Sequence, residues 1–472
     1  MRTPIADFVK EYANKKGSRF HMPGHKGQAF LGCETFDITE IAGADALYEA
    51  EGIIAESEKN ATELFGTART LFSTEGSSQC IRAMMHLVVG YWKSQQVTGV
   101  EADEVTVETQ AVRPYIIAAR NVHKAFLYAA ALVDFDVVWL YPEEMHSLCS
   151  CKVSAEQVEE ELKKQVAKRQ GVAPAAVYVT SPDYLGGRLD ITALAEVCHS
   201  YNTILAVDNA HGAYLHFLEE KQHPMDLGAD ICCDSAHKTL PVLTGGAYLH
   251  ISKTASAYFS ENAKQAMVLF GSTSPSYLTM ASLDLCNAYL ADGYRDKLST
   301  LIAQLGQLKK ELKEAGWLVN DTDPLKITIA ASKGVTGIES AEQLRGEGIE
   351  CEYVDEDFLV LMTTPENTGE DFENLVQAMH NVTSADVQEV LSAQAENRQL
   401  CPVRCEQKIS IREAIFAEQE MIKAEDSLDR ICGVPTVGCP PAIPIVVPGE
   451  EINEEAVALF KHYGVYTVAV VK

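Results

Sequence analysis

The stretch Ala229-Asp-Ile-Cys-Cys-Asp-Ser-Ala-His-Lys-Thr239 decides the fold of this chain. Its first half is an apolar run that predicts a buried strand, and its second half is small and polar and contains Lys238. A lysine just beyond a strand end can be desolvated, lose its charge and become a nucleophilic amine. Such an amine can form a Schiff base with an aldehyde cofactor. A lone Ser-x-His-Lys is more often an ordinary loop, so the interpretation depends on the rest of the chain.

Segments with strand and helix patterns alternate around this stretch. Apolar runs predict strands at 135–140, 175–180, 203–207 and 247–251. Helical apolar spacing predicts helices at 57–64, 79–90, 154–170 and 190–200. Another helix is predicted near the start of the chain, with Thr3 as its cap and Pro4 at its first position. Strands interleaved with helices of this length form a mostly parallel sheet covered on both faces, so the predicted fold class is α/β.

The composition changes near residue 290, where a long amphipathic helix over 296–315 begins a second region. In this region strands are predicted at 325–330, twice within 350–364, and at 465–471. Helices are predicted at 371–381, 385–397, 412–432 and 453–463, and a proline-rich loop at 435–448. The predicted division is an N-terminal segment at 1–60, a large domain at 61–290 and a smaller C-terminal α/β domain at 291–472.

Composition excludes several classes of function. The chain has 472 residues with 39 basic and 67 acidic side chains, so its net charge is 39 − 67 = −28. Such a charge repels nucleic-acid phosphates and weakly attracts cationic small molecules. The 13 cysteines lack the paired spacing of a zinc site, so no metal is expected. No secretory signal opens the chain and no apolar run could span a bilayer, which favours a cytoplasmic protein with reduced thiols and no membrane partner.

Three kinds of side chain fall where a parallel sheet binds ligands, beyond the carboxyl ends of its strands. Asp208 closes the apolar run at 203–207, and Lys238 follows the next predicted strand. Gly76-Ser77-Ser78 lies between a predicted strand and a helix, where backbone N–H groups and hydroxyls hold phosphates. Pyridoxal phosphate (PLP) needs these three partners, for its pyridine nitrogen, its aldehyde and its phosphate. Each signal alone is weak, because such residues are often simple caps or turn formers.

Six segments carry a resemblance to a known family. They are 20–27 (FHMPGHKG), 37–40 (DITE), 119–124 (ARNVHK), 207–212 (VDNAHG), 235–241 (SAHKTLP) and 272–277 (STSPSY). They resemble signature blocks of the Orn/Lys/Arg decarboxylases, which are PLP-dependent basic amino-acid decarboxylases of bacteria. The resemblance covers nearly the whole chain, which is similar to the short forms of the family. It implies the PLP-dependent transferase fold type I, in which a large domain with a mostly parallel sheet is followed by a smaller C-terminal α/β domain.

The resemblance also implies roles for individual residues. Lys238 would carry the Schiff base, Asp208 would pair with the pyridine nitrogen, and His211 would lie beside the ring near the substrate. His123 would stack on the face of the ring. The phosphate would be held by residues around the first helix of the large domain, namely Gly76, Ser77, Ser78, Ser235 and His237. Thr273 and Ser274 resemble a segment that reaches the partner subunit's cofactor site, which implies a homodimer with its active site at the subunit interface.

The expected reaction is decarboxylation of lysine, arginine or ornithine to the corresponding diamine or polyamine. The alternatives are a PLP-dependent aminotransferase or lyase acting on a related amino acid, and an inactive regulatory member of the family. Departures from the family pattern occur at Ser77 to Cys80, Asn209, Tyr214 and Cys439. They cluster where a substrate side chain would be recognised, so the sequence leaves the choice among the three amino acids open.

Overall fold

The computed structural model describes residues 1–15, 17–97, 113–383, 403–437 and 442–472. The chain divides into two units, each built from separate stretches of sequence. The first unit comprises 1–114, 166–178 and 191–296, and the second comprises 115–165, 179–190 and 297–472. The predicted domains, with boundaries at residues 60 and 290, are continuous stretches of sequence, whereas these units are interleaved. The predicted division stays a prediction.

The first unit is built around a sheet. Its hydrogen-bonded strand order is β1 (Arg69–Ser73), β7 (Ala247–Ile251), β6 (Ile231–Asp234), β5 (Ile204–Asp208) and β4 (Ala176–Thr180). Strands β5 and β6 pair in parallel, whereas β7 runs antiparallel to both β6 and β1. Nearly every residue of these strands is buried. This burial on both faces explains why the strands are continuous apolar runs rather than alternating patterns.

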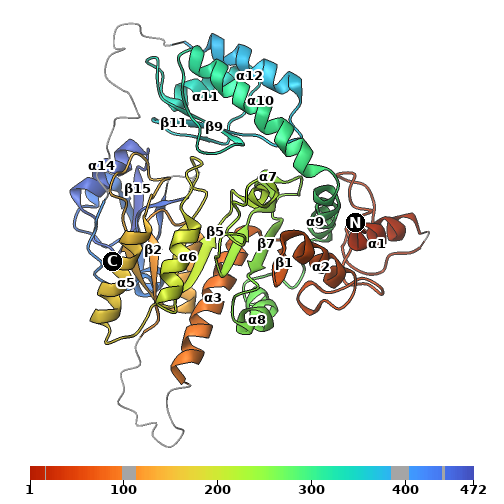
Figure 1. The fold of residues 1–472 in the computed structure, drawn as a ribbon, viewed down its shortest axis with the longest axis horizontal. Helices are drawn as coiled ribbons and strands as arrows, with labels where there is room; N and C mark the ends of the chain where they lie inside the picture. The colour runs from red at the N-terminus through yellow and green to blue at the C-terminus, as the bar shows by residue number, and fades with distance from the viewer. Residues whose placement is uncertain (16, 98–112, 384–402, 438–441) are drawn as a thin grey trace, which may run out of the picture. The chain divides into compact units, whose positions relative to one another are not determined.

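The helices of the first unit are α1 (Pro4–Asn14), α2 (Ile53–Phe65), α3 (Gly76–Val97), α6 (Ile191–Ser200), α7 (Ala236–Thr239), α8 (Ala257–Val268) and α9 (Tyr277–Ala291). Figure 1 shows α2, α8 and α9 around the β1 edge of the sheet. The first helix is not capped by Thr3 as predicted, because the Thr3 hydroxyl donates to Asp7 instead. Asp284 of α9 accepts the N–H groups of Ile5 and Ala6, at 2.9 and 3.0 Å, and satisfies the start of α1 from across the fold.

The second unit contains two α/β parts. Strands β2 (Tyr115–Ala119) and β3 (Asp136–Leu140) pair in parallel and are joined by α4 (Lys124–Val133), with α5 (Ala155–Lys168) following. A separate antiparallel sheet has the order β10 (Tyr353–Val354), β11 (Phe358–Met362), β9 (Lys326–Ala330) and β8 (Leu318–Asn320). Helices α10 (Tyr294–Glu314), α11 (Gly337–Gly346) and α12 (Gly369–Asn381) lie on one side of that sheet (Figure 1). Its helix α10 and strand β9 agree with the helix predicted at 296–315 and the strand predicted at 325–330.

The predicted helix at 412–432 is wrong. The helix α13 covers only Ile411–Phe416, and Gln419–Lys423 forms β12, which pairs with β15 (Thr467–Val471). The side-chain amide of Gln419 donates to the carbonyls of Ala414 and Ile415, which ends the helix. The predicted loop at 435–448 contains the short pair β13 (Thr436–Val437) and β14 (Pro444–Val446), and α14 (Glu454–His462) follows as predicted. The predicted helix at 385–397 and the departure at Cys439 lie outside the described residues.

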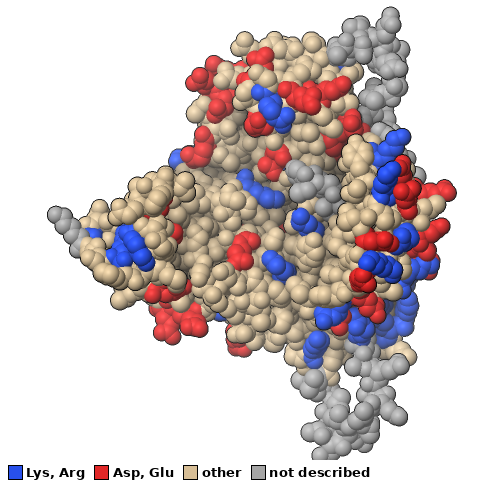
Figure 2. Space-filling model, turned by 180° about the vertical axis from the view of Figure 1, so that it is seen from behind, with Lys and Arg blue, Asp and Glu red and all other residues tan. Residues whose placement is uncertain are grey.

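The surface carries charges of both signs. Along one side of the face drawn in Figure 2, basic and acidic side chains are intermingled. Some surface lysines form ion pairs with acidic neighbours one helical turn away, as Lys163 does with Glu159. In the described part of the chain, no helix has both the length and the apolar character needed to cross a membrane.

Candidate active site

The parallel strands β5 and β6 bring three predicted catalytic residues to one end of the sheet. Asp208 is the last residue of β5 and is paired in register with Cys233 of β6. Lys238 lies on α7, the single helical turn that follows β6. Its Nζ is 2.9 Å from Nε2 of His211, which comes three residues after Asp208. Asp208, His211 and Lys238 therefore form one site, as expected from the rule for the carboxyl ends of parallel strands.

Asp208 is a buried carboxylate, only 2% exposed. It accepts hydrogen bonds from the Tyr178 hydroxyl at 3.2 Å, the Ala210 N–H at 3.1 Å and the Cys233 thiol at 3.7 Å. These three donors are all neutral. Burial raises the pKa of Asp208 because it disfavours the charged form, while the positive charge of Lys238 lowers that pKa. A cationic ligand group placed against this carboxylate would favour its ionised form.

Lys238 and His211 form a pair that can exchange a proton. The 2.9 Å contact joins an amine to an imidazole nitrogen, and either atom can be the donor. His211 is 4% exposed and Lys238 is partly buried, so bulk water is largely excluded from the contact. A neutral lysine amine is the nucleophilic form, and His211 can accept or return the proton that distinguishes the two states of the amine.

Four of the predicted phosphate-binding residues lie together at the start of α3. Gly76 begins that helix with a φ of +69°, a backbone conformation that favours glycine. Ser77 follows Gly76, and its Oγ accepts a hydrogen bond from the Ser235 hydroxyl at 2.8 Å. A Cβ added at Gly76 would lie 4.0 Å from Cε1 of His237, so the imidazole is its neighbour. Nδ1 of His237 donates to the Gly246 carbonyl at 3.0 Å, which orients the ring.

This donor set fits the cofactor predicted from the sequence. Two hydroxyls and an imidazole at the start of the 22-residue helix α3 suit a phosphate, which also gains from the positive end of the helix dipole. The buried Asp208 lacks a cationic hydrogen-bond donor among the described residues, and it suits a protonated pyridine nitrogen. Lys238 supplies the amine for the aldehyde. The groups lie at or just beyond the ends of β1, β5 and β6 of the same sheet.

Other predicted residues lie outside this cluster. Ser78 is the third residue of α3, and its carbonyl accepts from Arg82. Thr273 and Ser274 are exposed and precede α9. Their segment lies next to the phosphate-loop region, because the N–H of Ser272 donates to the carboxylate of Glu75. The roles of Ser78, Thr273 and Ser274 stay predictions.

His123 lies in the second unit as the N-cap of α4. Its Nδ1 accepts the N–H of Ala125 at 3.1 Å. An accepting Nδ1 places the ring proton of neutral His123 on Nε2, so the cap also sets the tautomer. Stacking of His123 on a cofactor ring stays a prediction.

Tyr178 is a site residue that the sequence analysis missed. It lies in the middle of β4, which reads Ala-Val-Tyr-Val-Thr and is buried. A buried tyrosine hydroxyl needs a hydrogen-bond partner, and here the partner is the carboxylate of Asp208. Proximity to Asp208 raises the pKa of Tyr178 beyond the effect of burial, so the hydroxyl remains a donor. A polar group in an otherwise apolar strand was the available signal.

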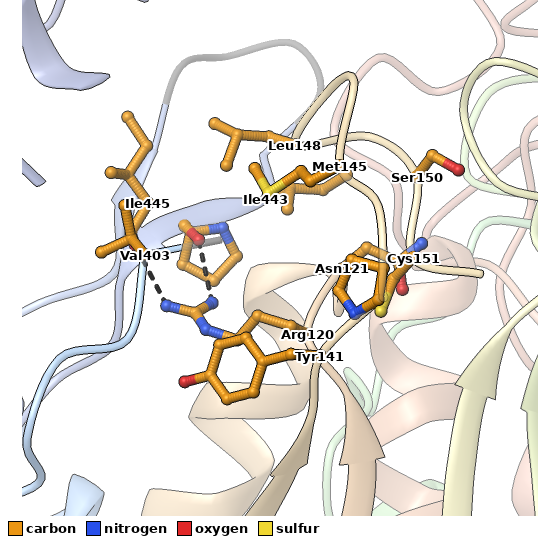
Figure 3. Close-up of a pocket in the computed structure, with 12 residues that line it drawn as sticks. Arg120, Asn121, Tyr141, Met145, Leu148, Ser150, Cys151, Val403, Ile443 and Ile445 are labelled. Carbon is orange, nitrogen blue, oxygen red and sulfur yellow. Dashed lines mark hydrogen bonds between the residues drawn. The ribbon is translucent and has the colours of Figure 1, made fainter. Parts of the chain in front are cut away.

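A small cavity in the second unit lies around Arg120, a residue with a structural role. It has a volume of about 20 Å³, and its lining includes Arg120 and Asn121 of the β2–α4 loop, Tyr141 just after β3, and Ile445 of β14 (Figure 3). This space suits a single water molecule. The Arg120 guanidinium donates to the carbonyls of Pro444 and Ile445, at 2.9 and 3.0 Å. It also pairs with the buried Glu450 at 3.4 Å, so Arg120 attaches the C-terminal segment to the β2 end.

Arg120→Met is expected to lower the free energy of unfolding by about 3 kcal/mol, because it leaves the Glu450 carboxylate buried without its counter-charge. Urea unfolding followed by circular dichroism measures this loss. Arg345→Met is the matched control, since Arg345 pairs with Glu350 at the exposed surface of the same unit. Equal losses in the two variants would contradict the structural role assigned to Arg120.

Comparison with known proteins agrees with the resemblance in the sequence. The profile of the family described as "Orn/Lys/Arg decarboxylase, major domain" matches residues 3–384. An arginine decarboxylase of Bacillus subtilis (strain 168) is 28% identical over 488 residues, covering 98% of this chain and 93% of that protein. The crystal structure of a Francisella novicida lysine decarboxylase superposes with a TM-score of 0.77 at 17% identity, covering 100% of this chain and 81% of that one.

A more distant solved structure shares the fold. It is described as SPT with PLP, and it superposes with a TM-score of 0.53 at 12% identity, covering 80% of this chain and 83% of that one. The predicted fold class, PLP-dependent transferase fold type I with a mostly parallel sheet, is confirmed by these neighbours and by the strand pairing.

Proposed function

This chain belongs to the Orn/Lys/Arg decarboxylase family and is a decarboxylase of a basic amino acid, and from that premise we propose that it uses PLP to release the α-carboxylate of arginine as CO2. The observation that carries the proposal is the contact between Lys238 and His211 at 2.9 Å, beside the buried Asp208. The aminotransferase, lyase and inactive-subunit alternatives raised by the sequence have no such support from the comparisons.

Each part of PLP has a partner in the first unit. Nζ of Lys238 would hold the aldehyde carbon, and the carboxylate of Asp208 would hold the protonated pyridine nitrogen. The start of α3 would hold the phosphate through Ser77, Ser235 and His237, with Ser78 added by the family resemblance, which assigns His123 to the face of the ring instead. When bound, PLP supplies an electron sink for the electron pair that the departing carboxylate leaves behind.

The protein's own groups manage charge and protons around that step. Asp208 would present its negative charge to the pyridine nitrogen, in a buried site where its electrostatic effect is strong. His211 exchanges a proton with the Lys238 amine across their contact. After CO2 has left, Lys238 or His211 would donate a proton to Cα, where it replaces the lost carboxylate. The product is the amine of the substrate, a diamine or polyamine precursor.

Arginine is proposed because a curated relative that matches almost the whole chain is an arginine decarboxylase. The net charge of −28 favours a cationic substrate of this kind. Lysine is the second candidate, because a similar solved structure is a lysine decarboxylase. The departures at Asn209 and Tyr214 leave the recognition of the substrate side chain to experiment.

The proposal is tested by a product assay on purified protein supplied with PLP. Arginine, lysine and ornithine are offered in turn, and the amine product, CO2 and any α-keto acid are measured by mass spectrometry. We expect amine and CO2 in equal amounts, with the highest kcat/KM for arginine. Faster turnover of lysine or ornithine would contradict the substrate, and an α-keto acid without CO2 would contradict the reaction.

We also propose that the enzyme is a cytoplasmic homodimer in which Thr273 and Ser274 reach the partner subunit's cofactor site. Support comes from the family resemblance and from the exposed position of both residues next to the Glu75 end of the phosphate loop. Light scattering gives the mass in solution. A monomer with full activity would contradict the shared site.

A further inference from the structure

A second buried cluster lies at the ends of β5 and β6, next to the candidate active site. Its centre is Asp234, the last residue of β6, and its other members are Asn209, His223 and His250, all four being 0% exposed. The side-chain amide of Asn209 donates to one carboxylate oxygen of Asp234 at 2.6 Å. Nε2 of His223 and Nε2 of His250 both lie 3.1 Å from the other oxygen. One carboxylate thus accepts from three buried side chains, and we call this group the Asp234 cluster.

The composition of the Asp234 cluster, two histidines and an aspartate, resembles a metal site, but its hydrogen bonds do not. The three candidate ligand atoms lie within 4.8 Å of one another. The N–H of Met225 donates to Nδ1 of His223 at 3.3 Å, so the proton of neutral His223 is on Nε2 and points at Asp234. A metal ion would need that nitrogen unprotonated. The Asp234 cluster is therefore a hydrogen-bonded unit.

The negative charge of Asp234 is stabilised by the two neighbouring histidines. Although burial alone would raise the pKa of Asp234, the histidines His223 and His250 hold that pKa well below its ordinary value. The carboxylate is therefore ionised and accepts strong, charge-assisted hydrogen bonds in a fully buried site. Such a group fixes the orientation of every donor around it, because a buried donor that turned away would lose its partner.

The Asp234 cluster is attached to each backbone segment that carries a predicted catalytic residue. Asn209 follows Asp208, and its N–H donates to the Cys233 carbonyl at 3.0 Å. Asp234 itself precedes Ser235, and the one-turn helix with Lys238 follows.

Asn209 also supports the segment that carries His211. A Cβ added at Gly212 would lie 2.1 Å from Oδ1 of Asn209, so this amide packs directly against the residue after His211. The hydrogen bond to Asp234 holds the amide nitrogen of Asn209 in place. Because the amide is planar, this bond also fixes the position of Oδ1, the atom that faces Gly212.

We propose that Asp234 is a positioning residue that sets the placement of Asp208, His211 and Lys238 relative to one another through Asn209 and the end of β6. The inference rests on the proposed function, because it concerns how these residues meet PLP. Asp234 does not touch the substrate or the cofactor in this proposal. It acts by holding two adjacent strand ends in one arrangement.

The test compares two buried aspartates at opposite ends of the same strand. Asp230 immediately precedes β6, is 5% exposed, and accepts from His199 at 3.0 Å and from the Leu205 N–H at 2.8 Å. Asp234→Asn and Asp230→Asn therefore remove the same charge from similar surroundings, but only the first change is at the active-site end. Each holoenzyme is assayed for melting temperature, for the rate at which PLP is released on dilution, and for the absorbance maximum of the bound cofactor.

We expect both variants to melt at a lower temperature than the parent protein. Asp234→Asn should release PLP at least tenfold faster, shift the absorbance maximum and lower kcat with little change in KM. Asp230→Asn should keep the release rate within twofold and leave the absorbance maximum unchanged. If Asp234→Asn matched Asp230→Asn in all cofactor measurements, the positioning role would be overturned.

A milder variant covers the case in which Asp234→Asn does not fold. Asn209→Ala removes one donor and keeps the carboxylate with its two histidines. We expect Asn209→Ala to change PLP release and absorbance in the same direction as Asp234→Asn. The double variant should release PLP no faster than Asp234→Asn alone, because both substitutions act through one contact. Parental cofactor properties in Asn209→Ala would overturn the proposal.

Two further outcomes are distinguished by measurements on the parent protein. Stoichiometric zinc in the purified protein, found by elemental analysis and lost in His250→Gln, would overturn the hydrogen-bonded assignment in favour of a metal site. A parent protein that takes up no PLP would overturn the proposed function itself. A parent that binds PLP, with variants that respond equally, would overturn only the role of Asp234.

Discussion

Lys238→Ala is expected to lower kcat for arginine by at least about 10³-fold, the scale of losing a nucleophile that also transfers protons. The variant loses the amine that would hold the aldehyde of PLP. It also loses the group that lies 2.9 Å from His211, so the proposed proton exchange has no partner. PLP would still meet Asp208 and the start of α3, so we expect weaker but measurable binding of the cofactor.

Borohydride reduction followed by peptide mass spectrometry makes the lysine assignment direct. The parent protein should carry the reduced PLP adduct on the peptide that contains Lys238, and Lys238→Ala should carry none. Lys264→Met is a suitable control, because Lys264 is a largely buried lysine of the same unit that pairs with Glu58 at 2.7 Å. It should lose stability yet keep the adduct on Lys238. An adduct on another lysine, with turnover retained in Lys238→Ala, would end the assignment.

The strands of the first sheet were predictable because they are buried on both faces. Their apolar runs at 175–180, 203–207 and 247–251 stand out from the surrounding sequence, and the structure places β4, β5 and β7 within one or two residues of them. Helices with a strong amphipathic pattern, such as α10, were equally clear. The rule that parallel strands present their carboxyl ends together then placed Asp208 next to Lys238.

The errors lie where a distant residue decides the local structure. The start of α1 is satisfied by Asp284, which is 279 residues from Ile5, so the local cap signal at Thr3 was misleading. The strand β12 reads Gln-Glu-Met-Ile-Lys and is mostly exposed, so it lacks the apolar signal of the buried strands. It is a strand because β15, 48 residues further along, supplies the hydrogen bonds of its ladder. Pairing of this kind is outside the reach of a local pattern.

The same distinction applies within the site. Lys238, Asp208 and the Gly76 loop follow strand ends and could be inferred from position alone. Tyr178 and the Asp234 cluster could not, because each is defined by contacts between different strands. Asn209 was noted only as a departure from the family pattern. The structure explains it as a donor to Asp234, a role that an acidic side chain at position 209 would fill only if it were protonated.

Asp208→Asn is expected to lower kcat by about 10²- to 10³-fold, the usual effect of losing a preorganised electrostatic group. The amide keeps the size of the side chain and can still accept from the Tyr178 hydroxyl. It cannot hold a positive charge on a pyridine nitrogen, because it is neutral. The electron sink would therefore be weakened while the fold and the PLP-binding residues remain, and we expect kcat to fall far more than the affinity for arginine.

Tyr178→Phe separates the charge of Asp208 from its hydrogen bonds. This variant removes a neutral donor at 3.2 Å and leaves the carboxylate, so the rate should fall by less than about tenfold. Stopped-flow measurement of kcat and the absorbance spectrum of bound PLP compare both variants under the same conditions. If Asp208→Asn lost no more activity than Tyr178→Phe, the carboxylate would be acting only as a hydrogen-bond acceptor, and the pyridine nitrogen would have to obtain its charge from another partner.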